Sequence, residues 1–157
     1  MKLPTFLGLL LLALSVHAAD RDSELARLEA NRAKWAEHGI NDYWVRMRDE
    51  ACWCLYGPYY GPIRLLVRDG KIRKAIYHGE RRDGYWPGRA VEVDTAPKAT
   101  IEEVFDNAKR VILTVPEGAY RIEYDKQFGF PMVIDVDRPD WEDEQWRLVV
   151  DGFKPLG

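Results

Sequence analysis

The chain has 157 residues, of which 46% are hydrophobic and 31% are charged, and its formal net charge at neutral pH is −3. This length predicts a single folded domain, and the hydrophobic fraction is sufficient to build a core. A slightly acidic chain without a basic stripe does not have the composition of a nucleic-acid binder. We therefore expect a well-solvated globular domain with no nucleic-acid partner.

The N-terminus has the three parts of a secretory signal peptide. Lys2 gives a short basic start, an apolar run extends from Phe6 to Val16, and Val16-His17-Ala18 places small or short residues before a cleavage point. The apolar run is too short to span a bilayer. We expect cleavage after Ala18, with residues 1–18 as the signal peptide and residues 19–157 as one domain without a membrane span. The alternative is a retained N-terminal anchor helix.

The first predicted helix begins near Ser23, because Leu25, Leu28 and Trp35 recur on one helical face. Gly39 is a typical residue just after a helix end. The following segment alternates between apolar and polar residues, which predicts strands over residues 43–48, 63–67 and 72–77.

Local turn signals organise the strands that follow. Asp69-Gly70 predicts a tight hairpin turn. The polar residues 79–88 predict a loop, and Val91 and Val93 could add a short edge strand.

The second predicted helix begins at Thr100, because Glu103 follows three residues later and completes a capping box. Pro116 and Gly118 predict its end. Its buried stripe is expected to contain Ile101, Val104, Phe105, Ala108 and Ile112. Three more strands are predicted over residues 120–124, 130–136 and 146–153.

This order of elements predicts an α+β fold in which two helices pack on one face of an antiparallel sheet. It also suggests two half-repeats, each a helix followed by about three strands. The sequence support for duplication is limited, because the spacings between matching residues differ in the two halves.

The inventory of reactive side chains is small. Ser23 is the one serine after the signal peptide, and a position at a helix start explains it, so a Ser-His-Asp hydrolase is close to excluded. His38 and His78 are expected to be surface or capping residues. No paired-histidine zinc motif and no glycine-rich phosphate loop occurs in the sequence. We therefore expect a protein that is not an enzyme and that uses no cofactor.

The two cysteines, Cys52 and Cys54, are only two residues apart. In an oxidising compartment such a pair usually forms a disulfide, but here the bridge would require a bend at Trp53. Three interpretations stay open beside free buried thiols: a structural bridge, a thiol-exchange site, and a copper or zinc site that uses both thiolates.

Aromatic residues crowd the predicted loops around the cysteines. Tyrosine and tryptophan in loops are enriched in binding surfaces, although they can also form a lid over a small core. Trp44 needs no such explanation, because it lies in a predicted strand. The candidate binding surface consists of Trp53, Tyr56, Tyr59, Tyr60, Tyr85 and Trp86.

Several short motifs occur together in a distinctive order: Trp35 before Asp42-Tyr43, Cys52-x-Cys54, Asp69-Gly70-Lys71, Thr100-Ile101-Glu102-Glu103-x-Phe105, Tyr124-Asp125, Phe128-Gly129-Phe130-Pro131 and Ile134-Asp135. In this order the chain resembles a family of small bacterial exported proteins catalogued as domain of unknown function 6174. The resemblance runs from about Leu25 to Phe153. It implies an exported α+β module, and it implies no activity.

From these features we predict a periplasmic or secreted protein of the bacterial cell envelope. Its expected role is that of a non-enzymatic binding or accessory module that uses the aromatic loops around Cys52 and Cys54. The expected partner is an envelope protein or a small ligand. The alternatives are a thiol-disulfide redox protein that uses the two cysteines and a protein that binds copper or zinc.

Overall fold

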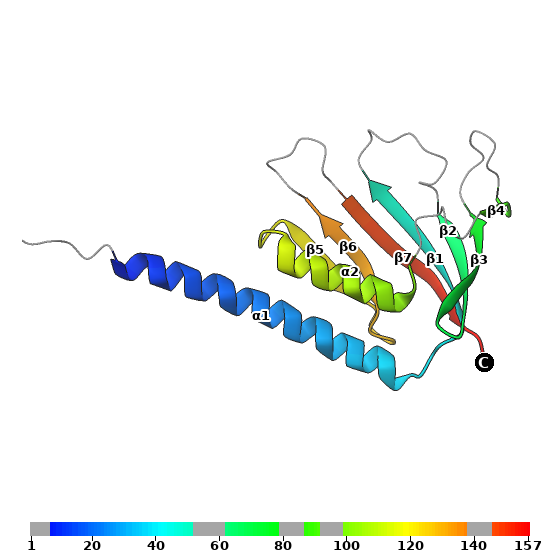
Figure 1. Cartoon of the computed structure of the whole chain (residues 1–157), viewed down its shortest axis with the longest axis horizontal. Coiled ribbons are helices and arrows are strands. Elements are labelled where there is room, and N and C mark those ends of the chain that lie inside the picture. Colours follow the sequence, from blue (N-terminus) through cyan, green and yellow to red (C-terminus); the bar gives the residue numbers. More distant parts are fainter. Residues whose placement is uncertain (1–6, 52–61, 79–86, 92–98, 138–145) are drawn as a thin grey trace, which may run out of the picture.

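The computed structural model describes residues 7–51, 62–78, 87–91, 99–137 and 146–157 (Figure 1). Its elements in chain order are α1 (Leu7–Glu37), β1 (Tyr43–Ala51), β2 (Ile63–Arg68), β3 (Lys71–Tyr77), β4 (Ala90–Val91), α2 (Ile101–Thr114), β5 (Tyr120–Tyr124), β6 (Pro131–Val136) and β7 (Trp146–Pro155). The strands form one antiparallel sheet, and both helices pack on one of its faces. The predicted α+β fold is confirmed.

The order of strands in the sheet is β4-β3-β2-β1-β7-β6-β5. Helix α1 is thus followed by the meander β1-β2-β3 with its short extension β4, and α2 is followed by the meander β5-β6-β7. The two meanders lie side by side and meet where β1 pairs with β7. The chain therefore contains the two predicted units of a helix followed by three strands, placed next to one another in one sheet.

The predicted start of the first helix is wrong. Ser23 lies inside α1, which begins at Leu7, so this serine is not an N-cap residue. The residues before it are mostly leucine and alanine, which favour the helix, and no proline lies between Leu7 and Ser23. The predicted end is correct, since α1 ends at Glu37 and Gly39 adopts a φ of 60°. In the parts of the chain that the structure describes, no helix is long and apolar enough to cross a membrane.

The predicted capping box of α2 is present. The Thr100 side chain accepts a hydrogen bond from the Glu103 N–H at 3.3 Å, and the Glu103 carboxylate accepts one from the Thr100 N–H at 2.6 Å. These two bonds satisfy backbone donors that every helix start leaves open. All five residues of the predicted stripe are buried against the sheet, each with no exposed surface: Ile101, Val104, Phe105, Ala108 and Ile112.

The hairpin between β2 and β3 has the predicted turn. Asp69 and Gly70 adopt φ angles of 51° and 66°, and positive values at both central residues define a type I′ turn. The short edge strand is confirmed at Val91, whereas Val93 lies outside the described residues.

A bulge in β7 sets which of its side chains face the helices. The pairing of β7 with β1 shifts between Trp44↔Lys154 and Arg46↔Asp151, and Gly152 between them has a φ of 57°. Phe153 therefore points toward the helices, where the centroid of its ring lies 5.6 Å from the centroid of the Trp35 ring. Because of the same bulge, Lys154 and Asp151 both lie on the opposite face of the sheet.

Two hydrogen bonds link the core to the helices. The Tyr43 hydroxyl accepts a bond from the Ile101 N–H at 2.9 Å, and the Trp35 indole N–H donates to Glu102 Oε1 at 3.0 Å. Burial raises the pKa of Tyr43 to about 12. These contacts join α1, β1 and the start of α2 into one unit.

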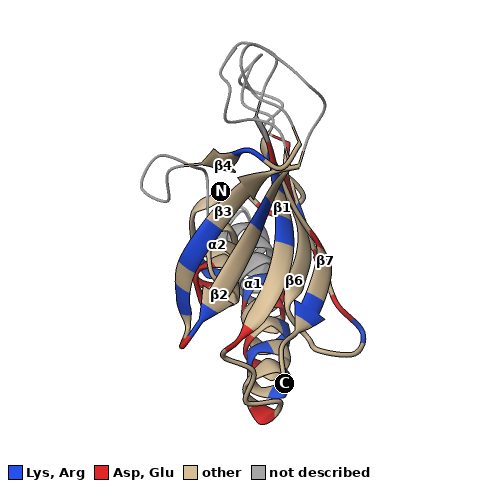
Figure 2. Ribbon diagram, turned by 90° about the vertical axis from the view of Figure 1, so that its right-hand side faces the viewer, with Lys and Arg blue, Asp and Glu red and all other residues tan. Residues whose placement is uncertain are grey.

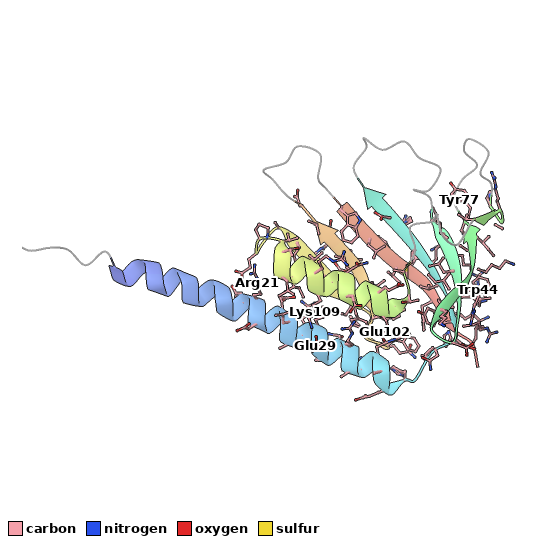
Figure 3. All side chains as sticks on the ribbon, viewed as in Figure 1. Arg21, Glu29, Trp44, Tyr77, Glu102 and Lys109 are labelled. Atoms are coloured by element: carbon pink, nitrogen blue, oxygen red, sulfur yellow. The ribbon has the colours of Figure 1, made fainter. Side chains whose placement is uncertain are left out.

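The two helices also contact each other directly. Glu29 of α1 and Lys109 of α2 face one another between the helices (Figure 3), with 3.2 Å between the carboxylate oxygen and the ammonium nitrogen. This pair is half-exposed, so it orients the helices and adds little stability.

Candidate functional site

The described ends of five strands meet at one end of the sheet, which we call the Trp146 end. It is defined by Ala51, Ile63, Tyr77, Val136 and Trp146, where β1, β6 and β3 finish and where β2 and β7 begin. The pairs Ala51↔Trp146, Val136↔Trp146 and Ile63↔Tyr77 hold these ends together. The sequence segments 52–61, 79–86 and 138–145 each begin or end next to this group.

All of the predicted site residues lie outside the described residues: Cys52, Trp53, Cys54, Tyr56, Tyr59, Tyr60, Tyr85 and Trp86. The bridging of the two cysteines and the exposure of the aromatic rings therefore stay predictions. What the structure does describe is the backbone on either side of these residues.

The residues that flank segments 52–61 and 79–86 are hydrogen-bonded to one another. The His78 N–H donates to the Pro62 carbonyl at 2.7 Å, and the Gly88 N–H donates to the Tyr77 carbonyl at 2.9 Å. Tyr77 in turn donates to the Arg89 carbonyl at 2.8 Å. The cysteine-bearing segment and the segment with Tyr85 and Trp86 therefore start from neighbouring points of the fold.

A carboxylic acid lies on the helix-facing side of the sheet near this end. Asp49 continues the buried series of Tyr43, Val45 and Met47 along β1, and it is half-buried. Its Oδ1 atom has almost no exposed surface and no hydrogen-bond partner among the described residues. Burial raises the pKa of Asp49, and a hydrogen bond from the Trp146 side chain opposes that rise.

Sequence reasoning did not single out Asp49. The available signal was its position, because an acid in phase with buried residues of a strand is placed where a carboxylate loses hydration. Such a group can accept a hydrogen bond or pair with a cation that a partner supplies. Among the described residues, Trp146 supplies the side-chain hydrogen bond that acts on the pKa of Asp49.

The histidines have the positions expected of structural or surface residues. His38 follows α1, its Nε2 lies 3.1 Å from the Gln127 carbonyl oxygen, and its ring packs against Phe128. His78 is exposed at the Trp146 end. In the described ranges, no three histidine, cysteine, aspartate or glutamate side chains come together so that they could hold a metal ion.

The uncovered face of the sheet carries a second feature that sequence reasoning missed. Trp44 lies in a strand, as predicted, but it is on the face opposite the helices and is half-buried there. The Arg64 guanidinium stacks over the Trp44 ring, 4.7 Å from its centroid. Figure 2 shows this face, with lysines and arginines in blue on the strands and both helices behind the sheet.

A polar hollow of about 270 Å³ lies between α1 and β5 and is lined in part by Asp20, Glu24, Arg27 and Glu117. Arg27 contributes two contacts here: it pairs with Glu24 at 3.2 Å, and it donates to the Ile122 carbonyl at 3.1 Å. Arg121 also lines the hollow and pairs with Glu123 at 3.1 Å, so both of these arginines are already bound by groups of the protein itself.

Residues 27–155 match the sequence profile of a family described as Family of unknown function (DUF6174). The chain belongs to this family. No curated protein and no solved structure matches the chain. The resemblance seen in the sequence is thereby confirmed for the family. Membership of this family assigns no activity to the protein, and its export and bacterial origin remain predictions.

Proposed function

We propose that this member of the DUF6174 family is an exported, non-enzymatic binding or accessory protein of the bacterial cell envelope. It would contact its partner through the aromatic residues in segments 52–61 and 79–86. The observation that carries the proposal is the hydrogen bonding between Pro62, Tyr77, His78 and Gly88 at the Trp146 end. Since the flanks of the two segments are joined, their tyrosines and tryptophans start from one place and can contribute to one surface.

Asp49 supports the same location. Burial makes the charged form of Asp49 less favourable, which raises its pKa. At neutral pH the ionised carboxylate therefore lowers the stability of the folded protein. Groups of this kind are concentrated near functional sites, because a fold retains a cost in stability where function requires it. Asp49 lies beneath the end of the sheet from which the aromatic segments start.

Photocrosslinking in the exported full-length protein tests the site. A photoreactive phenylalanine analogue replaces Tyr59 or Trp86, and in a matched control it replaces Leu113, whose side chain on α2 is 49% exposed. We expect a discrete covalent adduct with an envelope protein from positions 59 and 86 and none from position 113. Identical products from all three positions, or no product from any, would contradict the proposal.

Mass spectrometry of the native protein recovered from the envelope tests export and decides between the alternative roles. The proposal expects a chain that begins at residue 19 and a mass that corresponds to no bound metal. A chain that retains its first residues inside the cell contradicts export. Bound copper or zinc that is lost in Cys52→Ser favours the metal-binding alternative, and a thiol pair that cycles under mild reductant favours the redox alternative.

A further inference from the structure

The uncovered face of the sheet contains a regular array of cations around Trp44. We propose that this array, on β3, β2, β1 and β7, is a docking surface for an extended acidic polypeptide segment of a partner protein. The inference concerns a different surface from the Trp146 end and does not depend on what segments 52–61 and 79–86 do.

The strand register defines the array. One row across the sheet is Lys74–Leu66–Trp44–Lys154, and the adjacent row is Ile76–Arg64–Arg46–Asp151. All eight residues are on the face that the helices do not cover. Apolar side chains and the tryptophan thus form the floor, and cations stand at both ends of the first row and in the middle of the second.

Most of these cations lack an internal counter-charge. Arg46 pairs with Asp151 at 2.5 Å, whereas Arg64, Lys74 and Lys154 form no ion pair with any carboxylate in the described part of the chain. Arg64 also lies directly opposite Arg46 on the neighbouring strand. Like charges in opposed cross-strand positions destabilise a sheet. Asp151 already reduces this repulsion at Arg46, and an anionic group bound at Arg64 would reduce it further.

The spacing of the cations favours an extended chain over a small anion. Neighbouring strands are about 4.8 Å apart, so Lys74 and Lys154, three strands apart in one row, are separated by about 14 Å. Alternate side chains of an extended polypeptide are about 7 Å apart, so that acidic residues at every second position cover the same distance. A single phosphate or carboxylate could reach only one of Lys74 and Lys154 at a time.

The apolar part of the array favours a polypeptide over a membrane surface. Trp44, Leu66 and Ile76 are half-buried on this face, whereas insertion into a bilayer is typical of protruding aromatic and aliphatic residues. Among the described residues the large hydrophobic side chain that is strongly exposed is Leu113, and it lies on α2, on the helix side of the molecule. The uncovered face therefore offers cations and a shallow apolar surface, which match carboxylates and the aliphatic parts of a peptide.

Binding of fluorescein-labelled oligoglutamate to the full chain, measured by fluorescence anisotropy, tests the proposal. Oligoglutamine of the same length, anionic lipid vesicles and single-stranded DNA serve as comparison probes. We expect binding of oligoglutamate that weakens as salt is raised and that exceeds binding of every comparison probe. The double variant Arg64→Glu/Lys74→Glu should lower the affinity at least about tenfold.

The matched control is Arg110→Glu/Lys126→Glu, which makes the same change of charge at two exposed cations outside the array. This control should bind oligoglutamate like the parent. The milder variant Arg64→Gln/Lys74→Gln, checked by circular dichroism, separates loss of binding from loss of folding. Equal effects of the two double reversals, absence of oligoglutamate binding, or preferred binding to vesicles or DNA would each overturn the proposal.

Discussion

The two faces of the sheet differ most clearly along β1, where successive residues point to opposite sides. Tyr43, Val45 and Met47 face the helices and are at most 3% exposed. Their neighbours Trp44 and Arg46 face solvent, where each contacts a charged residue of an adjacent strand. The same strand thus supplies a dry interior surface and a charged exterior one. Folding depends on the first, and the second remains available for interaction.

The largest expected difference between the faces is in the cost of removing an aromatic ring. Phe105→Ala should lower the free energy of unfolding by about 3–5 kcal/mol, because it leaves a cavity between α2 and the sheet. Trp44→Ala should cost about 1–2 kcal/mol, because the ring is half-buried and stacks on one guanidinium. Urea unfolding followed by circular dichroism measures both values. Equal costs would mean that the uncovered face is part of the structural core.

Two glycines test the same contrast in the backbone. Both have positive φ, 86° at Gly129 and 57° at Gly152, so an alanine is strained at either position. At Gly129 the added methyl group would lie 2.6 Å from the Asn31 carbonyl oxygen of α1, whereas at Gly152 it would meet Arg46 at an ordinary 3.5 Å. Gly129→Ala should therefore cost about 3 kcal/mol or more, and Gly152→Ala about 1 kcal/mol. Thermal unfolding that ranks Gly152→Ala as the worse variant would contradict the packing of α1 on this turn.

Two tyrosines on the helix side should make the protein less stable in alkali. Burial raises the pKa of Tyr43 and of Tyr124 to about 12, above the value near 10 expected in the unfolded chain. As the pH rises, these two tyrosines therefore ionise first in the unfolded state. The stability that their protonated hydroxyls give the folded protein is complete below pH 10 and is lost as the pH rises toward 12. The free energy of unfolding, measured across this range, should fall in the parent and in each Tyr→Phe variant. The fall should be about 2 kcal/mol smaller in each variant, because the variant lacks one of the two hydroxyls.

At neutral pH the same two variants should differ from each other. Tyr43→Phe leaves the Ile101 N–H without its acceptor and should cost about 1–2 kcal/mol. The Tyr124 hydroxyl has no hydrogen-bond partner among the described residues, so Tyr124→Phe should be neutral or stabilising. A loss of stability in Tyr124→Phe as large as that in Tyr43→Phe would show that this hydroxyl has a partner.

Asp49 is the exception on the helix side of β1, and its removal should stabilise the protein. Because the pKa of Asp49 is raised in the folded state, its ionisation opposes folding at any pH above the unfolded value of 3.8. Asp49→Asn should increase the free energy of unfolding at pH 7 by around 1 kcal/mol, and the gain should disappear below about pH 4. A variant that is less stable than the parent at pH 7 would show that the carboxylate is paired.

The smallest effect is expected for the ion pair on the uncovered face. Arg46 and Asp151 are both partly exposed, with 41% and 37% of their side-chain surfaces accessible. Asp151→Asn should lower the free energy of unfolding by less than about 1 kcal/mol, and high salt should abolish the difference. A larger effect that persists in salt would assign this pair a structural role.

Much of the fold could be predicted because its signals are local. The type I′ turn depends on Asp69 and Gly70 alone, and the capping box depends on Thr100 and Glu103. The predicted start of α1 at Ser23 is wrong, because the helix-forming residues before this serine continue the helix although serine is a good cap residue.

The cation array could not be predicted, because it depends on contacts between distant parts of the chain. Trp44 and Lys154 are in one row only because β1 pairs with β7, and the bulge at Gly152 decides that Lys154 faces outward. Sequence alternation places Trp44 and Arg46 on the same face of β1, but it does not tell which face the helices cover. The environment of Asp49 is non-local as well, since its side-chain hydrogen bond comes from Trp146 on β7.

The hydrogen bond from Arg27 to the Ile122 carbonyl also has a consequence for aggregation. Strand β5 is at the edge of the sheet, and exposed edge strands can pair with strands of another molecule. Arg27 occupies an acceptor of that edge and places a charge beside it. At the opposite edge, β4 is only two residues long and offers little backbone for such pairing. Arg27 thus blocks one acceptor of the β5 edge, and the shortness of β4 limits the backbone that this strand offers to another molecule.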